Sequence, residues 1–124
     1  MRTIPQISEA ELEVMKVIWE LSETTSAQIV ERLTQTTVWK PKTVHTLISR
    51  LVAKDAIKAE RTGSKAFVYS ALVSEQEYKA YANNSLLQKL YNGSINLMFT
   101  SFIKEQKLSK SEIDRLKKLL DEEG

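Results

Sequence analysis

Three successive segments in the first half of the chain carry apolar side chains at helical spacing, which restricts this half to a small helical fold. Two of the segments repeat the full i, i+3, i+4, i+7 pattern that builds one apolar face of a helix. The members are Val14, Val17, Ile18 and Leu21 in the first segment, Ala27, Ile29, Val30 and Leu33 in the second, and Val44, Leu47, Ile48 and Leu51 in the third. Each segment therefore predicts a short helix whose apolar face packs in a common core.

Polar and capping residues mark the limits of these helices. Ser8 and Glu11 have the spacing of a capping box, in which each side chain accepts a hydrogen bond from the other residue's backbone amide. The first helix should start there, and a polar break at residues 24–26 should precede the second helix. Pro41 suits the first turn of the third helix, where a missing N–H costs nothing.

Two short segments after the third helix indicate a β-hairpin. Residues 57–61 and 65–70 are the predicted strands, and Gly63 lies in the turn between them, where it can adopt a positive φ. Phe67 and Tyr69 are two residues apart and so share one face of the second strand, which we expect to pack on the first helix. The expected aromatic members of the core are Trp19, Trp39, Phe67 and Tyr69.

The rest of the chain predicts three further helices. A capping box at residues 74–77 opens a long helix, Gly93 interrupts it, and a capping motif at residues 109–112 opens the last helix. The whole pattern predicts a mainly α-helical protein. Its first part is a winged helix-turn-helix of three helices and a β-hairpin over residues 1–73, and a helical dimerisation region follows over residues 74–124.

Composition argues against several classes of protein. The 124 residues contain no cysteine and a single histidine, His45, so they offer no ligand set for a usual zinc or copper site. No nucleophile and base stand in a catalytic arrangement, and we therefore expect neither an enzyme nor a cofactor. No apolar run is long enough for a membrane span and no signal peptide is recognisable, which favours the cytoplasm.

Positive charge is concentrated in the middle of the chain. The net charge of +2 divides into −3 for residues 1–39, +5 for residues 40–73 and zero for residues 74–124. A localised basic stretch is the electrostatic signature of a nucleic-acid partner, but a solvated surface with chance clustering has the same composition. Charge alone leaves both interpretations open.

The third helix carries the side chains that decide between them. Its polar side lies opposite the apolar face, and no acidic residue occurs from Lys40 to Lys54, whereas an ordinary solvated helix mixes both signs. Arginine can bond bidentately to guanine, threonine can contact a base, and lysine and serine can bind phosphates. We therefore predict contact with double-stranded DNA through this helix and, on a weaker signal, through the basic hairpin. The predicted DNA-binding residues are Lys40, Lys42, Thr43, His45, Thr46, Ser49, Arg50, Arg61 and Lys65.

The C-terminal region is rich in large apolar side chains for its size. A three-helix tail can build only a small core of its own, so these side chains either form the centre of that core or pack against a second subunit. We expect a homodimer. The predicted dimerisation residues are Leu86, Leu90, Ile95, Met98, Phe99, Phe102, Ile103, Ile113, Leu116 and Leu120.

Four segments resemble the penicillinase-repressor family, BlaI/MecI, and its copper-responsive relative CopY. They are residues 8–19 (SEAELEVMKVIW), 39–51 (WKPKTVHTLISRL), 63–69 (GSKAFVY) and 108–116 (LSKSEIDRL). The similarity spans nearly the whole chain, and the run that begins at Trp39 is its most specific part. The resemblance implies a homodimeric repressor that binds a palindromic operator and dimerises through its C-terminal helices. The residues that it implies face the DNA are Lys42, Thr43, Thr46 and Arg50.

The sequence departs from the family pattern in three places. It lacks the C-terminal cysteine cluster of CopY-like members, which argues against direct copper sensing. Members that respond to β-lactams are inactivated by cleavage of an Asn–Phe bond, and the aligned bond here is Ser101–Phe102, so relief of repression by a membrane sensor protease stays open. Lys40 replaces the serine that often caps the third helix, which should weaken the start of that helix and add a charge near phosphate.

Three alternatives to a cleavable repressor follow from the residues. Met98, Phe99 and Phe102 could line a pocket for a small apolar ligand, which would make the protein a ligand-sensing winged-helix regulator. A repressor of the copper-responsive type without the cysteine metal site is the second alternative. The third is a winged helix used only for protein contacts, which would favour acidic or apolar residues on the third helix, and the opposite is seen.

Overall fold

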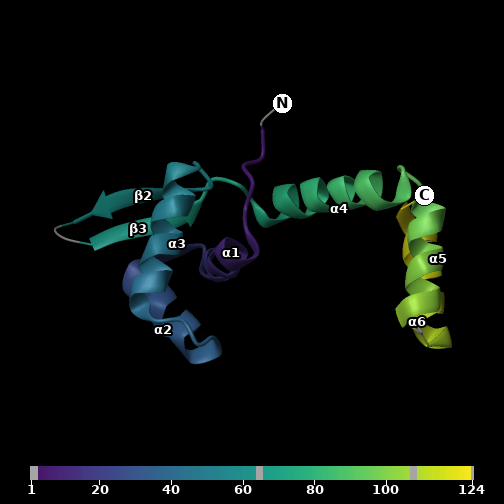
Figure 1. Cartoon of the computed structure of the whole chain (residues 1–124), viewed down its shortest axis with the longest axis horizontal. Coiled ribbons are helices and arrows are strands. Elements are labelled where there is room, and N and C mark those ends of the chain that lie inside the picture. The colour runs from purple at the N-terminus through teal and green to yellow at the C-terminus, as the bar shows by residue number, and fades with distance from the viewer. Residues whose placement is uncertain (1–2, 64–65, 107–108, 124) are drawn as a thin grey trace. The chain divides into compact units, whose positions relative to one another are not determined.

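The computed structural model describes residues 3–63, 66–106 and 109–123 (Figure 1). The chain forms two compact units, one ending at Tyr81 and the other beginning at Ala82. Along the described residues the elements follow in the order helix, strand, two helices, two strands and three helices. This order confirms the mainly helical fold that the apolar pattern predicts.

Three helices enclose the core of the first unit. They are α1 (Glu9–Leu21), α2 (Ser26–Thr36) and α3 (Pro41–Ala53). The three predicted apolar faces meet there, because burial removes their apolar surface from water. Ala27, predicted on the buried side of the second helix, is the exception and is exposed. The buried apolar side chains of this cluster are Val14, Met15, Val17, Ile18, Ile29, Leu33, Val44, Leu47, Ile48, Leu51, Ala56 and Ile57. Trp19, Trp39 and Tyr69 are partly buried against them, as predicted.

Side-chain caps explain where the first two helices begin. The Ser8 hydroxyl accepts a hydrogen bond from the Glu11 amide at 3.1 Å, and the Glu11 carboxylate accepts one from the Ser8 amide at 2.9 Å, which confirms the predicted capping box. A second box at α2, which the sequence analysis did not select, joins Thr25 and Gln28 in the same way. By contrast α3 begins at Pro41, and its N-cap residue Lys40 makes no side-chain hydrogen bond.

A three-stranded antiparallel sheet completes the first unit. Its strands are β1 (Glu23–Thr25), β2 (Ile57–Thr62) and β3 (Ala66–Ala71), in the spatial order β1-β3-β2. Strands β2 and β3 form the predicted hairpin, and Gly63 has the expected positive φ, of 67°. Residues 24–26 were predicted only as a polar break, and strand β1, which includes two of them, corrects that prediction.

Phe67 corrects a second expectation. Phe67 lies on the same face of β3 as Tyr69, as predicted. The register pairs Arg61 with Phe67 and Ala59 with Tyr69 on this face of the hairpin. Tyr69 packs against the core, but Phe67 is 44% exposed. The hairpin extends past the edge of the helical core, so its core-facing side becomes solvent-exposed towards the tip.

Helices account for the second unit. They are α4 (Glu75–Tyr91), whose first two turns belong to the first unit, α5 (Ile95–Gln106) and α6 (Lys110–Glu123). The predicted caps are present, because Ser74 and Ser109 exchange hydrogen bonds with Glu77 and Glu112. Along the described parts of the chain, every helix falls short of the length and hydrophobicity that a bilayer span requires.

Candidate nucleic-acid interface

Helix α3 buries one face and exposes the other. Val44, Leu47, Ile48 and Leu51 are in the core, which turns the polar side of the helix to solvent. All the predicted residues of this segment are exposed together on that side. They are Lys40, Lys42, Thr43, His45, Thr46, Ser49 and Arg50, which we call the α3 polar face.

The cations of the α3 polar face form no ion pair with a carboxylate in the described part of the chain. These cations are Lys40, Lys42 and Arg50. The α3 segment itself contains no acidic residue, so the field of these cations is uncancelled locally. Such a face attracts a polyanion.

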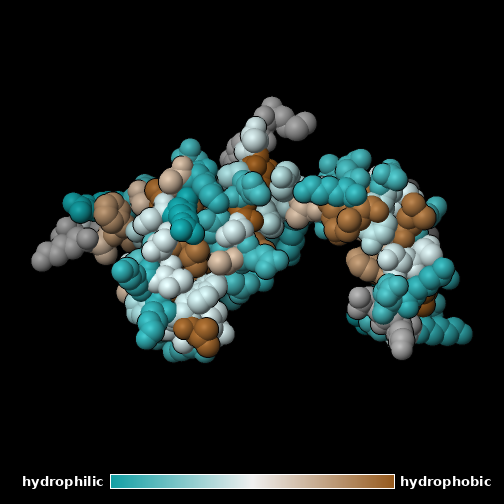
Figure 2. All heavy atoms as spheres, viewed as in Figure 1, coloured by the Kyte–Doolittle hydropathy of each residue, from teal (hydrophilic) through white to brown (hydrophobic). Residues whose placement is uncertain are grey.

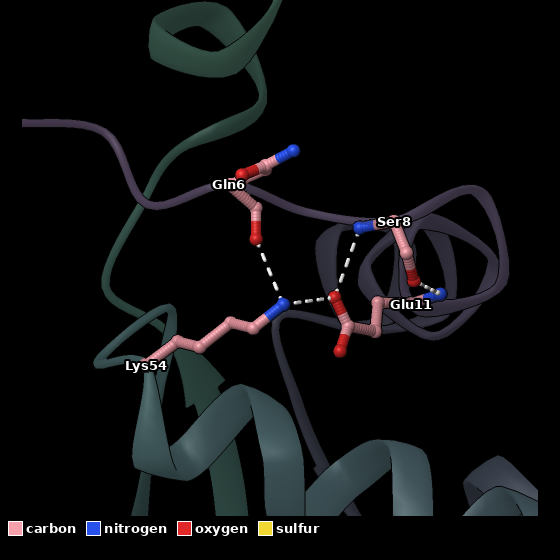
Figure 3. Close-up of polar contacts among 4 residues, drawn as sticks. All are labelled: Gln6, Ser8, Glu11 and Lys54. Atoms are coloured by element: carbon pink, nitrogen blue, oxygen red, sulfur yellow. Dashed lines mark hydrogen bonds and ion pairs between the residues drawn. The ribbon is translucent and has the colours of Figure 1, made fainter.

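Lys54, at the C-terminal end of α3, has a structural partner instead (Figure 3). Its Nζ donates to Oε1 of Glu11 at 2.5 Å and to the backbone oxygen of Gln6 at 2.8 Å. The same carboxylate oxygen also accepts a hydrogen bond from the backbone amide of Ser8. This cluster ties the end of α3 to the start of α1 and so helps to fix the orientation of α3.

Glu11 is charged although its side chain is only 3% exposed. Burial raises the pKa of Glu11, but the hydrogen bonds and positive charge of Lys54, together with the hydrogen bonds of Ser8, outweigh it and hold the pKa below its usual value. The carboxylate therefore favours the folded state at neutral pH. Glu11 is predictable from the sequence as a capping residue, but its partner Lys54 is not, because it lies 43 positions away.

Thr46 offers DNA a restricted set of contacts. Its hydroxyl donates to the backbone oxygen of Lys42 at 3.0 Å, so the hydroxyl hydrogen is already used within the helix. Its methyl group and its acceptor lone pairs remain. A threonine in this state suits apolar contact with a thymine methyl group better than donation to a base.

The connection between α2 and α3 presents Val38 to solvent. The Thr37 hydroxyl donates to the Leu33 oxygen at 2.6 Å and accepts from the Trp39 amide at 3.1 Å, and Trp39 is half-buried. Between these fixed neighbours Val38 is 97% exposed. Val38 was not among the predicted site residues, although a lone valine just before the start of α3 is visible in the sequence.

The hairpin contributes one unpaired cation among its described residues. The Nζ of Lys58 lies 2.8 Å from the Glu60 carboxylate, whose hydrogen bond and negative charge raise the pKa of Lys58. Arg61 is exposed, and its guanidinium carbon lies 5.1 Å from the centre of the Phe67 ring. Lys65, the other predicted contact, lies outside the described residues.

The predicted dimerisation residues lie at or near the surface of the second unit, and Figure 2 shows hydrophobic groups exposed there. No described side chain from residue 82 onward is fully buried. Those with large exposed fractions are Leu86, Leu90, Ile95, Phe102 and Ile103. Those of intermediate exposure are Met98, Phe99, Ile113 and Leu116, and the side chain of Leu120 lies outside the described part.

The Ser101–Phe102 bond lies in the interior of α5. The hydroxyl of Tyr91, at the end of α4, lies 3.4 Å from the Ser101 hydroxyl oxygen. A protease binds an extended segment, so this bond becomes accessible only if α5 unwinds locally.

Within the described residues, no group of three histidine, cysteine or carboxylate side chains is placed to hold a metal ion.

Comparison with known proteins assigns the chain to a family. The model of the penicillinase repressor family matches residues 7–122. The chain belongs to this family. It is 40% identical to a penicillinase repressor of Bacillus licheniformis over 98% of the chain and 94% of that protein. It is also 34% identical to the methicillin resistance regulatory protein MecI of Mammaliicoccus sciuri, over 94% of each.

Solved structures of penicillinase-repressor relatives match the winged helix. The solution structure of the DNA-binding domain of the repressor BlaI has a TM-score of 0.55 at 44% identity. The monomeric form of Bacillus licheniformis BlaI in complex with the blaP half-operator has a TM-score of 0.56 at the same identity. Both matches cover 63% of this chain and 94% of the solved chain, and they confirm the winged-helix fold.

Proposed function

We propose that this member of the penicillinase repressor family is a transcriptional repressor that binds operator DNA through the α3 polar face and the β2–β3 hairpin. The observation that carries the proposal is the α3 polar face itself, whose three cations are exposed and have no carboxylate partner among the described residues. A relative with 44% identity is described in complex with a half-operator. In helix-turn-helix proteins the recognition helix lies in the major groove, which supports the same placement for α3.

Each exposed side chain suits a different part of the DNA. Arg50 can bond bidentately to guanine, and Lys40 and Lys42 can neutralise phosphates. Thr46, whose hydroxyl hydrogen is used within the helix, suits the methyl group of thymine. Val38 can add an apolar contact beside the start of α3, because it is exposed and held between fixed neighbours.

The repressor is a homodimer in this account, joined through residues 74–124. The second unit exposes several large apolar side chains and has no fully buried described side chain, so a single chain leaves apolar surface in water. A second copy offers the same surface with two-fold symmetry. Two tethered winged helices then gain affinity for two half-sites through effective concentration, without any new contact.

Cleavage of the Ser101–Phe102 bond, by a membrane sensor protease, is the proposed way to relieve repression. The cut would separate α6 and the end of α5 from the rest of the dimerisation region. Since the bond is in a helix, the protease must capture an unwound form of α5. Repression would then end because the two winged helices are no longer held together.

A salt titration of DNA binding tests the proposal. Fluorescence anisotropy should show tighter binding of the full chain to a duplex from its own promoter than to a shuffled duplex. The affinity should fall steeply with salt, because several phosphates are neutralised. Lys42→Gln should lower the salt slope by about one, whereas Lys16→Gln, on α1 beside Glu13, should leave it unchanged. Equal affinity for both duplexes at every salt concentration would contradict the proposal.

A further inference from the structure

Phe67 is an exposed aromatic residue without a role in the core. It lies on the core-facing side of the hairpin, the side on which Ile57 is 1% exposed. The Arg61–Phe67 pair is four register pairs closer to the tip than the pair of Ile57 with Ala71. There the helices no longer cover this side, and Phe67 is 44% exposed. An aromatic ring that stays in solvent gains little of the free energy that burial of its apolar surface would provide.

The partner of Phe67 is Arg61. The two residues are directly opposite each other in the β2–β3 register, and the guanidinium carbon lies 5.1 Å from the ring centre. This distance is within the range of a cation–π contact. Glu60 neighbours Arg61 in sequence but points to the other side of the strand and pairs with Lys58.

The contact restrains Arg61 without neutralising it. A carboxylate partner would cancel the charge of the guanidinium, as Glu60 does for Lys58. An aromatic ring has no net charge, so the full positive charge stays available to a phosphate. A long arginine side chain loses conformational freedom when it binds, and a side chain already held in place loses less.

We propose that Phe67 is a positioning residue for DNA binding, whose ring holds Arg61 in the orientation in which its guanidinium meets the sugar–phosphate backbone. This inference rests on the proposed function, because it assumes that the hairpin contacts DNA. Phe67 itself need not touch the DNA. Its effect on affinity therefore depends on the presence of Arg61.

A double-mutant cycle in the full chain tests this dependence. The variants are Phe67→Leu, Arg61→Ala and the combination of both, and Phe67→Tyr keeps the ring as the conservative control. The measurement is anisotropy with the promoter duplex and with a random-sequence duplex at low salt, since a backbone contact is independent of sequence. Thermal unfolding of each variant shows that the hairpin still folds.

Phe67→Leu should weaken binding to both duplexes by about two- to fivefold, the size of an exposed cation–π contact. Phe67→Tyr should bind like the parent, and Phe67→Leu should have no effect once Arg61 is alanine. The inference would be overturned if Phe67→Leu lowered the affinity equally with and without Arg61. It would also be overturned if Phe67→Leu alone, or Arg61→Ala alone, left the affinity unchanged. If the parent binds neither duplex, the proposed DNA-binding function itself is wrong. This outcome differs from one in which the parent binds DNA and only the role of Phe67 is wrong.

Discussion

At the residue scale, the proposed function makes Arg50 the side chain on which recognition of the operator sequence should depend most. It is exposed on α3, has no carboxylate partner in the described parts of the chain, and has the geometry to bind guanine. Arg50→Ala should cost about 1–3 kcal/mol of binding free energy and relax specificity at one base pair. Binding to a panel of operators with single base-pair changes measures both effects.

Lys16→Ala is the matched control for Arg50→Ala, because Lys16 is also exposed and cationic but lies on α1 beside Glu13. Its operator affinity should equal that of the parent. Unchanged affinity of Arg50→Ala would show that α3 does not lie in the groove in the proposed orientation.

Glu11 is the residue whose charge state links pH to stability. Its pKa in the folded chain is below its usual value, so its contribution is present at neutral pH and is lost as the pH falls through and below about 4.3, the usual glutamate value. Glu11→Gln should lower the free energy of unfolding at pH 7 by about 1–2 kcal/mol, since it breaks an ion pair in which the carboxylate is buried and the lysine is 35% exposed. Urea unfolding of parent and variant between pH 7 and pH 3 should show the difference shrinking with acid.

Glu13→Gln provides the comparison, because Glu13 forms an exposed pair with Lys16 that contributes little. It should change the free energy of unfolding by less than about 0.5 kcal/mol at every pH. A difference between parent and Glu11→Gln that stayed constant down to pH 3 would show that the Glu11 charge does not stabilise the fold.

At the scale of elements, we expect the start of α3 to be less stable than a capped helix start and to bind DNA more tightly in return. Its N-cap residue Lys40 makes no capping hydrogen bond, and a serine there can accept one from the backbone. Lys40→Ser should therefore raise the free energy of unfolding by about 0.5–1 kcal/mol and lower the salt slope of DNA binding by about one. Chemical unfolding and a salt titration measure the two effects separately.

Lys40→Gln separates the two causes, because it removes the charge without supplying a good cap. Lys40→Gln should lower the salt slope of DNA binding as much as Lys40→Ser does, but it should not raise the free energy of unfolding. The interpretation fails if Lys40→Ser binds DNA as tightly as the parent at all salt concentrations.

The elements also show how far sequence reasoning reaches. All six helices and the hairpin were predicted, because each depends on a local period, a cap or a turn residue. Strand β1 was missed, since three polar residues form a strand here only by pairing with β3, more than forty positions away. Phe67 was assigned to the correct face but to the core, because alternation fixes the side of a strand and not where the core ends.

Part of the candidate site could likewise be predicted from the sequence and part could not. Exposure of the α3 polar face follows from a helical period, so sequence alone predicts it. The contacts that position this face, from Lys54 to Glu11 and from Arg61 to Phe67, depend on tertiary packing or register and appear only in the structure.

At the scale of the whole molecule, the account makes dimerisation a condition of tight binding. A chain ending at Ser101 should be a folded monomer, since the DNA-binding domain of the relative BlaI has a solution structure by itself. It should bind the operator about 100-fold more weakly than the full chain, because the gain from two tethered winged helices is lost. Sedimentation velocity and anisotropy on the same samples measure the two quantities. A truncated chain that stayed dimeric and bound as tightly as the full chain would remove both the dimerisation and the cleavage proposals.

Footprinting of the full chain on the promoter of its own operon shows whether the protein binds a two-fold symmetric operator. A dimer that reads DNA through two copies of α3 should protect two symmetric half-sites on one face of the duplex, with centres about one helical turn or a small multiple apart. The protection should weaken as the salt concentration rises, and more steeply the more phosphates the protein neutralises. Absence of any protected site at moderate salt would contradict the account.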